Sequence, residues 1–229
     1  MEGQYVAYSF FRVDPAWRRL PIEERAAGKD AFAEVVEDWA GRDGRAAGLH
    51  RHRRSPRLRL LPLEDHAALR GPRRARRGAQ RNAARRLAGD AVLVPRDDEG
   101  FRVHEGAPPR KVVPKGSPYL VVYPFVKLRP WYASPPEDRQ RAMEEHMRVG
   151  AEFATIHNHT TYSFGIDDQE FMTAFECDEP ADFMHLMLTL RESEASRYTE
   201  RDTPIFVGQH VDIRAALDAL DGAPARVGA

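Results

Sequence analysis

The stretch from residue 118 to residue 154 limits the possible folds most, because it combines two kinds of periodicity. Residues 118–127, PYLVVYPFVK, are rich in β-branched and aromatic side chains and predict a half-buried strand. Ser134 then offers an N-cap, Pro135 suits the first helical position, and two acidic residues fall in the first turn. The stretch is therefore expected to form a strand, a turn and a helix that runs to about Ala154.

Further strands and helices are predicted on both sides of this stretch. In chain order they are a strand at 4–12, a helix at 21–39, strands at 155–164 and 169–177, a helix from 179 that Asp178 can cap, and a strand at 203–208. The order strand, helix, strand, strand, helix, strand after residue 117 is the ferredoxin-like α+β pattern. The sequence therefore predicts an α+β fold.

One histidine lies on the apolar face of the central helix. Side chains at three- and four-residue spacing share this face, namely Met143, His146, Met147, Gly150, Phe153 and Ala154. A histidine among such neighbours is more often a hydrogen-bonded core residue than a metal ligand. The helix alone leaves both interpretations of His146 open.

Several motifs together resemble a known family. The runs YPFVK, TTYSFGIDDQEF and DTPIFVG, with EH on the helix between the first two, resemble the chlorite dismutase-like family and, within it, the coproheme decarboxylases. The likeness covers residues 5–25 and 104–213. It implies tandem ferredoxin-like halves of the dimeric α+β barrel type: an N-terminal half at 1–114, a porphyrin-binding half at 115–215 and a tail at 216–229.

The resemblance implies a porphyrin site and assigns residues to it. His146 takes the position of the axial ligand of the iron, and Glu194 that of a carboxylate on the other imidazole nitrogen. Trp131 matches a tryptophan beside the porphyrin. Without the resemblance, Glu194 would be a solvated helix charge and Trp131 a packing residue.

Three residues of the central strand complete the expected site. Tyr123 matches the tyrosine that, in coproheme decarboxylases, carries the radical that attacks a propionate. Phe125 and Lys127 alternate onto the same strand face as Tyr123. In the family, a lysine at the position of Lys127 pairs with a propionate carboxylate; the alternative is a surface lysine at a strand end.

The distal side of the porphyrin separates the activities within the family. Chlorite-degrading members have an arginine there, and one branch of decarboxylases has a glutamine. The aligned position falls on Asn158, or on His159 if the gap is placed differently, and no arginine occurs in 155–164. This argues against chlorite dismutation and leaves His157 or His159 as a possible general base for peroxide. These two histidines share a strand face and give only a weak metal-binding signal.

The resemblance therefore predicts peroxide-dependent oxidative decarboxylation of iron coproporphyrin III to haem b. The porphyrin would be substrate and cofactor at once, with hydrogen peroxide as the oxidant. The alternatives are a haem b peroxidase or chlorite dismutase-like enzyme, and a haem-binding protein without turnover. A homopentamer is implied by the family alone.

The composition sets broader limits. No apolar run approaches the roughly 20 residues of a membrane-spanning helix, and the N-terminus lacks the pattern of a secretion signal. The single Cys177 excludes an internal disulfide framework, which favours a reducing cytoplasm. We therefore expect a cytoplasmic protein without a membrane partner.

Residues 41–102 differ sharply from the rest of the chain. They hold 17 Arg, no Lys and 7 acidic residues, and no Phe, Trp or Tyr occurs between Ala40 and Gly100. At face value this indicates a disordered arm that binds nucleic acid or an acidic surface. A frameshift explains the segment better. With one base dropped and suitable codons chosen, its parts can read as strand, helix and strand in the order of the family, so we do not expect a nucleic-acid partner.

We hypothesise that one base is gained within codons 41–48 and one lost near codon 102. The N-terminal ferredoxin-like half would then be disrupted in the chain as translated. Nucleotide sequencing across both positions tests the hypothesis: the shifted frame should be open and encode family-like strands and a helix. Stop codons in that frame would refute it.

Overall fold

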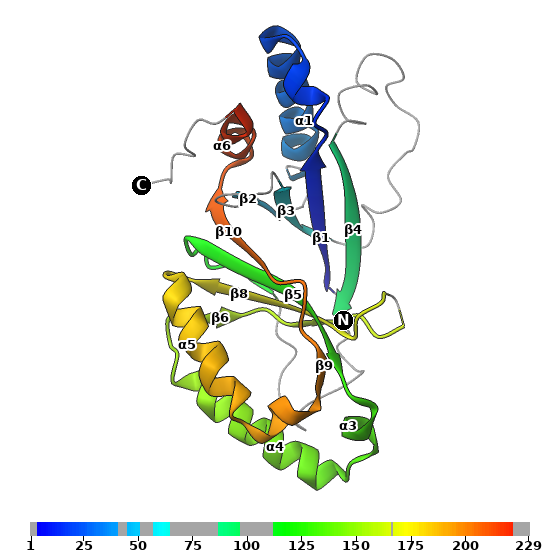
Figure 1. The fold of residues 1–229 in the computed structure, drawn as a ribbon, viewed down its shortest axis with the longest axis vertical. Helices are drawn as coiled ribbons and strands as arrows, with labels where there is room; N and C mark the ends of the chain where they lie inside the picture. Colours follow the sequence, from blue (N-terminus) through cyan, green and yellow to red (C-terminus); the bar gives the residue numbers. More distant parts are fainter. Residues whose placement is uncertain are drawn as a thin grey trace. The chain divides into compact units, whose positions relative to one another are not determined.

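The computed structural model describes residues 4–40, 45–50, 57–64, 87–96, 112–165 and 167–221 (Figure 1). Its contacts divide the chain into two compact units. Unit 1 consists of residues 1–3 and 94–207, and unit 2 of residues 4–93 and 208–229. Both units contain antiparallel strands and helices, so the fold is α+β, as predicted.

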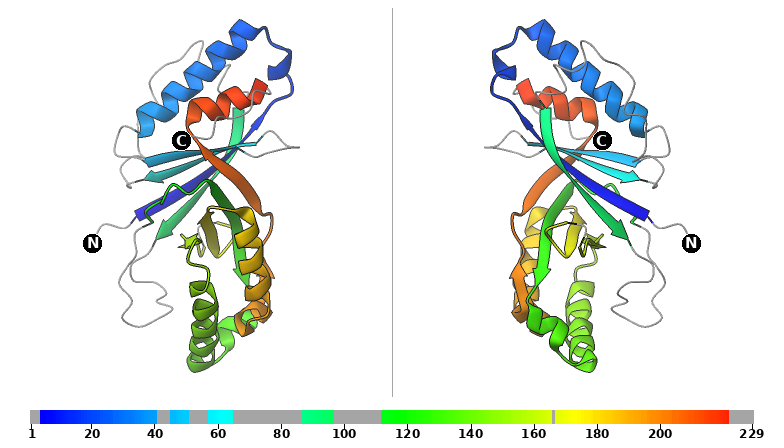
Figure 2. Two further views of the ribbon diagram at one scale, coloured as in Figure 1. Left: turned by 90° about the vertical axis from the view of Figure 1, so that its left-hand side faces the viewer. Right: turned by 90° about the vertical axis from the view of Figure 1, so that its right-hand side faces the viewer.

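Unit 1 is built on a long antiparallel pair, β5 (Tyr119–Lys127) and β8 (Phe171–Cys177). Three short strands extend it: β6 (His157–Asn158) and β7 (Thr161–Tyr162) pair with β8, and β9 (Thr199–Arg201) pairs with the end of β5. Its helical segments are α3 (Arg129–Ala133), α4 (Pro136–Ala151), α5 (Pro180–Arg191) and the 3₁₀ helix η3 (Glu194–Tyr198). Helices α4 and α5 lie on the same face of the β5–β8 sheet (Figures 1 and 2).

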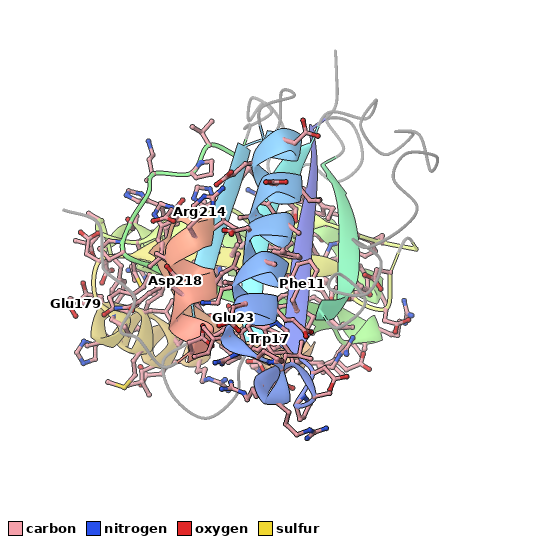
Figure 3. All side chains as sticks on the ribbon, turned by 90° about the horizontal axis from the view of Figure 1, so that it is seen from above. Phe11, Trp17, Glu23, Glu179, Arg214 and Asp218 are labelled. Atoms are coloured by element: carbon pink, nitrogen blue, oxygen red, sulfur yellow. The ribbon has the colours of Figure 1, made fainter. Side chains whose placement is uncertain are left out.

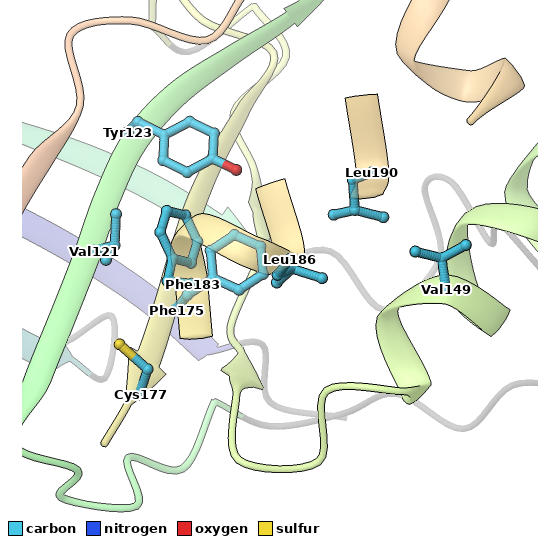
Figure 4. Packing of buried hydrophobic residues seen from close by; sticks show 8 residues of the cluster. All are labelled: Val121, Tyr123, Val149, Phe175, Cys177, Phe183, Leu186 and Leu190. Atoms are coloured by element: carbon cyan, nitrogen blue, oxygen red, sulfur yellow. The ribbon is translucent and has the colours of Figure 1, made fainter. Parts of the chain in front are cut away.

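The core of unit 1 lies between that sheet and its helices. Alternate residues of a strand point to one face, and Val121, Tyr123, Phe175 and Cys177 reach the helical side from β5 and β8. They meet Val149 of α4 and a row from α5: Phe183, Leu186 and Leu190 (Figure 4). Burial of this aromatic and aliphatic surface holds both helices on the strands.

Unit 2 has the strand order β4–β1–β3–β2–β10. These strands are β1 (Gln4–Val13), β2 (Arg45–His50), β3 (Arg57–Glu64), β4 (Leu87–Arg96) and β10 (Phe206–Val211), which starts in unit 1. Its helical segments are η1 (Trp17–Arg19), α1 (Ile22–Ala40), α6 (Ile213–Asp218) and η4 (Ala219–Asp221). Figure 3 shows α1 and α6 side by side over the sheet, with Trp17 at one end of α1.

The segment 213–221 packs firmly against α1 in unit 2. Leu217 and Leu220 are buried with Trp17, and Lys29 pairs with Asp218 at 3.1 Å. Helical structure thus continues to Asp221, inside the range expected as a tail; the final residues 222–229 lie outside the described residues. In the described parts of the chain, no helix is both long and apolar enough to cross a membrane.

The predicted elements are present, with local corrections. The strands at 4–12 and 118–127 and the helix at 21–39 are confirmed as β1, β5 and α1. The central helix begins one residue late, at Pro136, because Ser134 is not its cap, and it ends at Ala151 instead of about Ala154. Ser134 ends the unpredicted helix α3, and its hydroxyl donates to the Pro130 carbonyl at 2.7 Å. The exposed Met147 does not lie on the buried face, contrary to the prediction.

The elements after the central helix differ more from the prediction. The strand expected at 155–164 is divided into β6 and β7, because Oδ1 of Asn158 accepts hydrogen bonds from the backbone N–H and hydroxyl of Thr160. Asp178 does not cap α5, whose N-cap is Glu179 without a side-chain bond. The last strand lies at Phe206–Val211 instead of 203–208.

The Arg-rich segment contributes strands β2, β3 and β4 to unit 2. Strands β3 and β4 overlap two of the segments that read as strands in the shifted frame, and the intervening segment, which reads as a helix there, lies outside the described residues. The frameshift stays a hypothesis.

The packing of α5 yields a stability prediction. Leu186 is 3% exposed, whereas Leu188 on the same helix is 58% exposed. Leu186→Ala should lower the free energy of unfolding by about 2–5 kcal/mol because it leaves a cavity. Leu188→Ala makes the same chemical change at the surface and should cost less than about 1 kcal/mol. Urea unfolding of both variants checks this, and equal losses would contradict the packing of α5.

Candidate functional site

The end of β5 meets α3, α4 and η3 in one cluster of side chains. Trp131 of α3 is buried with Ala142 of α4 and Ala195 of η3. Its indole lies against the Tyr198 ring, with 5.3 Å between centroids. The backbone N–H of Leu128 donates to the Tyr198 carbonyl at 2.8 Å, which fixes the chain where it leaves the strand. Three helical segments therefore surround the last residues of β5.

Lys127 is the charged residue of this cluster and is only 7% exposed. Its ammonium group lies 4.2 Å from the centroid of the Trp131 ring and 5.4 Å from that of Phe125, and it donates to the Ala195 carbonyl at 3.0 Å. Burial lowers the pKa of Lys127 to about 8, although the nearby Glu170 carboxylate opposes this effect. Most of the group is still cationic at neutral pH, so it can attract an anion.

His146 lies on α4 one turn after Ala142. Burial lowers the pKa of its imidazole, and the charge of Lys127 lowers it further, while Glu145 acts in the opposite direction. Among the described residues and their atoms, the buried Nδ1 of His146 has no hydrogen-bond partner. A neutral imidazole with an unpaired buried nitrogen can serve as a metal ligand.

Glu194 does not hydrogen-bond to His146 in this structure. Its carboxylate accepts from Arg197 at 3.1 Å, and its backbone N–H donates to the Glu145 carboxylate at 2.9 Å. The helix η3 is nevertheless held beside α4 through Glu145. The role expected of Glu194 stays a prediction that requires a change of its side-chain position.

Tyr123 lies deeper in the core of unit 1. Its ring stacks on Phe175 with 6.1 Å between centroids, and its hydroxyl donates to the sulfur of Met187 at 3.7 Å. Burial raises the pKa of the phenol to about 12, so it is protonated at neutral pH. Tyr123 and Lys127 both come from β5, but their side chains contact different clusters.

The two candidates for the distal position lie on different faces of the sheet. Asn158 is in register with Phe175, whose ring stacks on Tyr123, and residues in register share a face. Nε2 of His159 instead lies 2.7 Å from the carboxylate of Glu176, which alternates with Phe175 along β8. The geometry therefore places Asn158 on the face of Tyr123 and His159 on the opposite face.

Two buried carboxylates on or beside β8 were missed by the sequence analysis. Glu170 accepts hydrogen bonds from the Lys127 backbone and from Tyr132, and Glu176 accepts from the backbone N–H groups of residues 115–117. Gly116, with φ of 80°, allows these successive amides to converge. An acidic residue in a strand that is otherwise apolar, as in QEFMTAFEC, was the available signal.

Among the residues that the structure describes, His146 is not part of a cluster of metal-ligating side chains. Within the described ranges, no group of three or more His, Cys, Asp and Glu side chains is placed to hold a metal ion.

Comparisons with solved structures identify the fold. A mutant chlorite dismutase from Candidatus Nitrospira defluvii superposes with a TM-score of 0.77, at 20% identity and over 95% of each chain. A heme-binding protein from Thermus thermophilus gives a TM-score of 0.74, at 23% identity and over 97% of this chain and 96% of that one. The chain thus has the chlorite dismutase fold.

Sequence comparisons agree with this fold. Residues 99–211 match the family described as Chlorite dismutase, so the chain carries a chlorite dismutase family domain. A coproheme decarboxylase of Mycolicibacterium smegmatis is 35% identical over 102 residues, which is 44% of each chain. A coproheme decarboxylase of Thermus thermophilus is 26% identical over 94% of this chain and 93% of its own length. The resemblance inferred from the motifs is confirmed.

Glu176 yields a prediction about stability and pH. Burial alone would raise the pKa of this carboxyl, but hydrogen bonds with His159 and the backbone of Lys115 and Ser117 outweigh it and lower the pKa from 4.5 to about 2. An acid whose pKa is lower in the folded state stabilises the fold at pH values above its pKa in the unfolded chain. This stabilisation is lost as the pH falls toward the pKa in the folded state. Glu176→Gln should therefore lower the free energy of unfolding by about 1–3 kcal/mol at pH 7.

The same difference should shrink as the pH falls below about 4.5, because the wild-type carboxylate then begins to lose its advantage. Urea unfolding of both proteins at a series of pH values measures it. A difference that stays constant between pH 7 and pH 3 would show that the ionised carboxylate does not stabilise the fold.

Proposed function

We propose that this chain binds iron coproporphyrin III at His146 and, with hydrogen peroxide, oxidatively decarboxylates two propionates to yield haem b. The observation that carries the proposal is the half-buried, neutral imidazole of His146, whose buried Nδ1 is unpaired, near the ammonium group of Lys127. The chlorite dismutase family match and the two relatives named coproheme decarboxylase support it.

The residues present fit an iron porphyrin. His146 would hold its iron, and Nδ1 of this imidazole has no competing hydrogen bond within the described residues. Trp131 and Phe125 supply aromatic surface close to the Lys127 ammonium. Asn158 would line the porphyrin site, and Glu194 would orient His146 after rotating away from Arg197.

Lys127 and Tyr123 have distinct roles in the proposal. The ammonium group of Lys127 would pair with one propionate carboxylate, which has the opposite charge. Tyr123 keeps its phenolic proton at neutral pH and can give up a hydrogen atom, so it would carry the oxidation to a propionate. The bound iron would supply the oxidising power derived from peroxide.

We extend the proposal to a homopentameric ring in the cytoplasm. The family resemblance supports the ring, and the single cysteine of the chain supports a reducing compartment.

Mass spectrometry of the porphyrin after addition of peroxide tests the reaction. Wild-type protein should produce two successive losses, each of one carbon dioxide and two hydrogens. Tyr123→Phe should abolish both losses, because the hydrogen-donating hydroxyl is gone, while porphyrin affinity stays nearly unchanged. Tyr119→Phe removes a hydroxyl from the same strand and serves as the control, with turnover retained.

Two outcomes would contradict the proposal. Porphyrin binding by the wild-type protein without any mass loss would favour a haem-binding or peroxidase function. Full turnover by Tyr123→Phe would refute the role of Tyr123.

A further inference from the structure

The carboxylate of Glu170 lies directly behind the junction of β5 and α3. Glu170 is 9% exposed and directly precedes β8. One oxygen accepts hydrogen bonds from the backbone N–H of Lys127 at 2.8 Å and from the hydroxyl of Tyr132 at 2.5 Å. The other lies 3.8 Å from the guanidinium group of Arg129. A single side chain thus contacts the last residue of β5 and two residues of α3.

The backbone at this junction lacks the regular pairing of the strand. The ladder of β5 with β8 ends at the pair Phe125–Phe171, and the pairing with β9 shifts register between Val126 and Lys127. The backbone N–H of Glu170 donates to the Phe125 carbonyl at 3.2 Å, which brings its carboxylate to the point where the regular ladder stops. Lys127 still pairs with Thr199 of β9, so the carboxylate takes the place of a partner on the β8 side only.

The direction of the chain at Lys127 decides where the candidate anion-binding group lies. The ammonium group must turn toward η3 to reach the Ala195 carbonyl, and Trp131 must pack four residues later so that its ring lies 4.2 Å from the ammonium. Charged acceptors form stronger hydrogen bonds than neutral ones. Loss of the Glu170 carboxylate would leave a buried N–H unsatisfied and free α3 to shift.

We propose that Glu170 is a positioning residue: by holding the Lys127 backbone and Tyr132, it fixes the Lys127 ammonium over Trp131 in the site that would receive a propionate. The binding of a propionate at this site rests on the proposed function. The arrangement of Lys127 and Trp131 is a property of the unloaded protein and is measured there.

The variants separate this role from general stabilisation. Glu170→Ala removes the acceptor, whereas Glu170→Gln keeps an oxygen for the Lys127 N–H. Glu176→Ala is the matched control. Glu176 is also buried and also accepts hydrogen bonds from backbone N–H groups, but these belong to residues 115–117 and not to Lys127. A merely structural role would give similar effects at both glutamates.

The first measurement is the NMR signal of the Lys127 side chain in unloaded protein with isotopically labelled lysine. A ring current from Trp131 should displace this signal in wild type, and Lys127→Arg assigns it. Glu170→Ala should move the signal toward that of a free lysine, and Glu170→Gln should largely restore it. Glu176→Ala should leave it in place.

The second measurement is the affinity for iron coproporphyrin III. The affinity should fall about tenfold in Glu170→Ala. It should fall less than about threefold in Glu170→Gln, because the glutamine amide keeps one hydrogen bond to the Lys127 backbone, and less than about threefold in the control Glu176→Ala. Failure of wild type to bind would refute the proposed function, while the NMR result would still decide the role of Glu170.

An unchanged Lys127 signal in folded Glu170→Ala would overturn the inference, and so would an equal change in Glu176→Ala. If Glu170→Ala does not fold, the double variant Glu170→Gln with Tyr132→Phe replaces it. This variant loses both the charge and the Tyr132 contact and should shift the signal partway; no shift would overturn the inference.

Discussion

Burial of the Lys127 ammonium is the constraint on which the candidate site depends. Removal of a charge from water costs several kcal/mol unless other groups compensate it. Here the Ala195 carbonyl accepts a hydrogen bond, and the faces of Trp131 and Phe125 offer cation–π contacts. These groups come from η3, α3 and β5, so the ammonium is stable only when all three segments are packed correctly.

The same ammonium also influences the imidazole of α4. Its charge adds to burial in lowering the pKa of His146, which keeps the imidazole neutral and able to bind a metal. One cation can therefore favour an anionic group of a ligand and, at the same time, the ligating state of a histidine. This coupling suits a molecule that carries both a metal and carboxylates, as the proposed substrate does.

Local sequence patterns predicted β5 and α4, because alternation and helical spacing are properties of neighbouring residues. The family resemblance, and not these patterns, assigned His146 and Lys127 to one site; in the structure the charge of Lys127 helps to lower the pKa of His146. The local patterns could not predict that Glu170 would bind the backbone of Lys127, 43 residues away in sequence. The cap at Ser134 failed for a related reason: Ser134 is the C-terminal cap of the unpredicted helix α3, where its hydroxyl donates to the Pro130 carbonyl.

The central claim is that His146 ligates the iron of a bound porphyrin. A spectroscopic titration of iron coproporphyrin III into the wild-type protein and His146→Ala tests it most directly. Wild type should bind to saturation with the absorption and electron paramagnetic resonance spectra of an imidazole-ligated ferric iron, and His146→Ala should lose these spectra until free imidazole is added. Identical spectra for the two proteins would contradict the account.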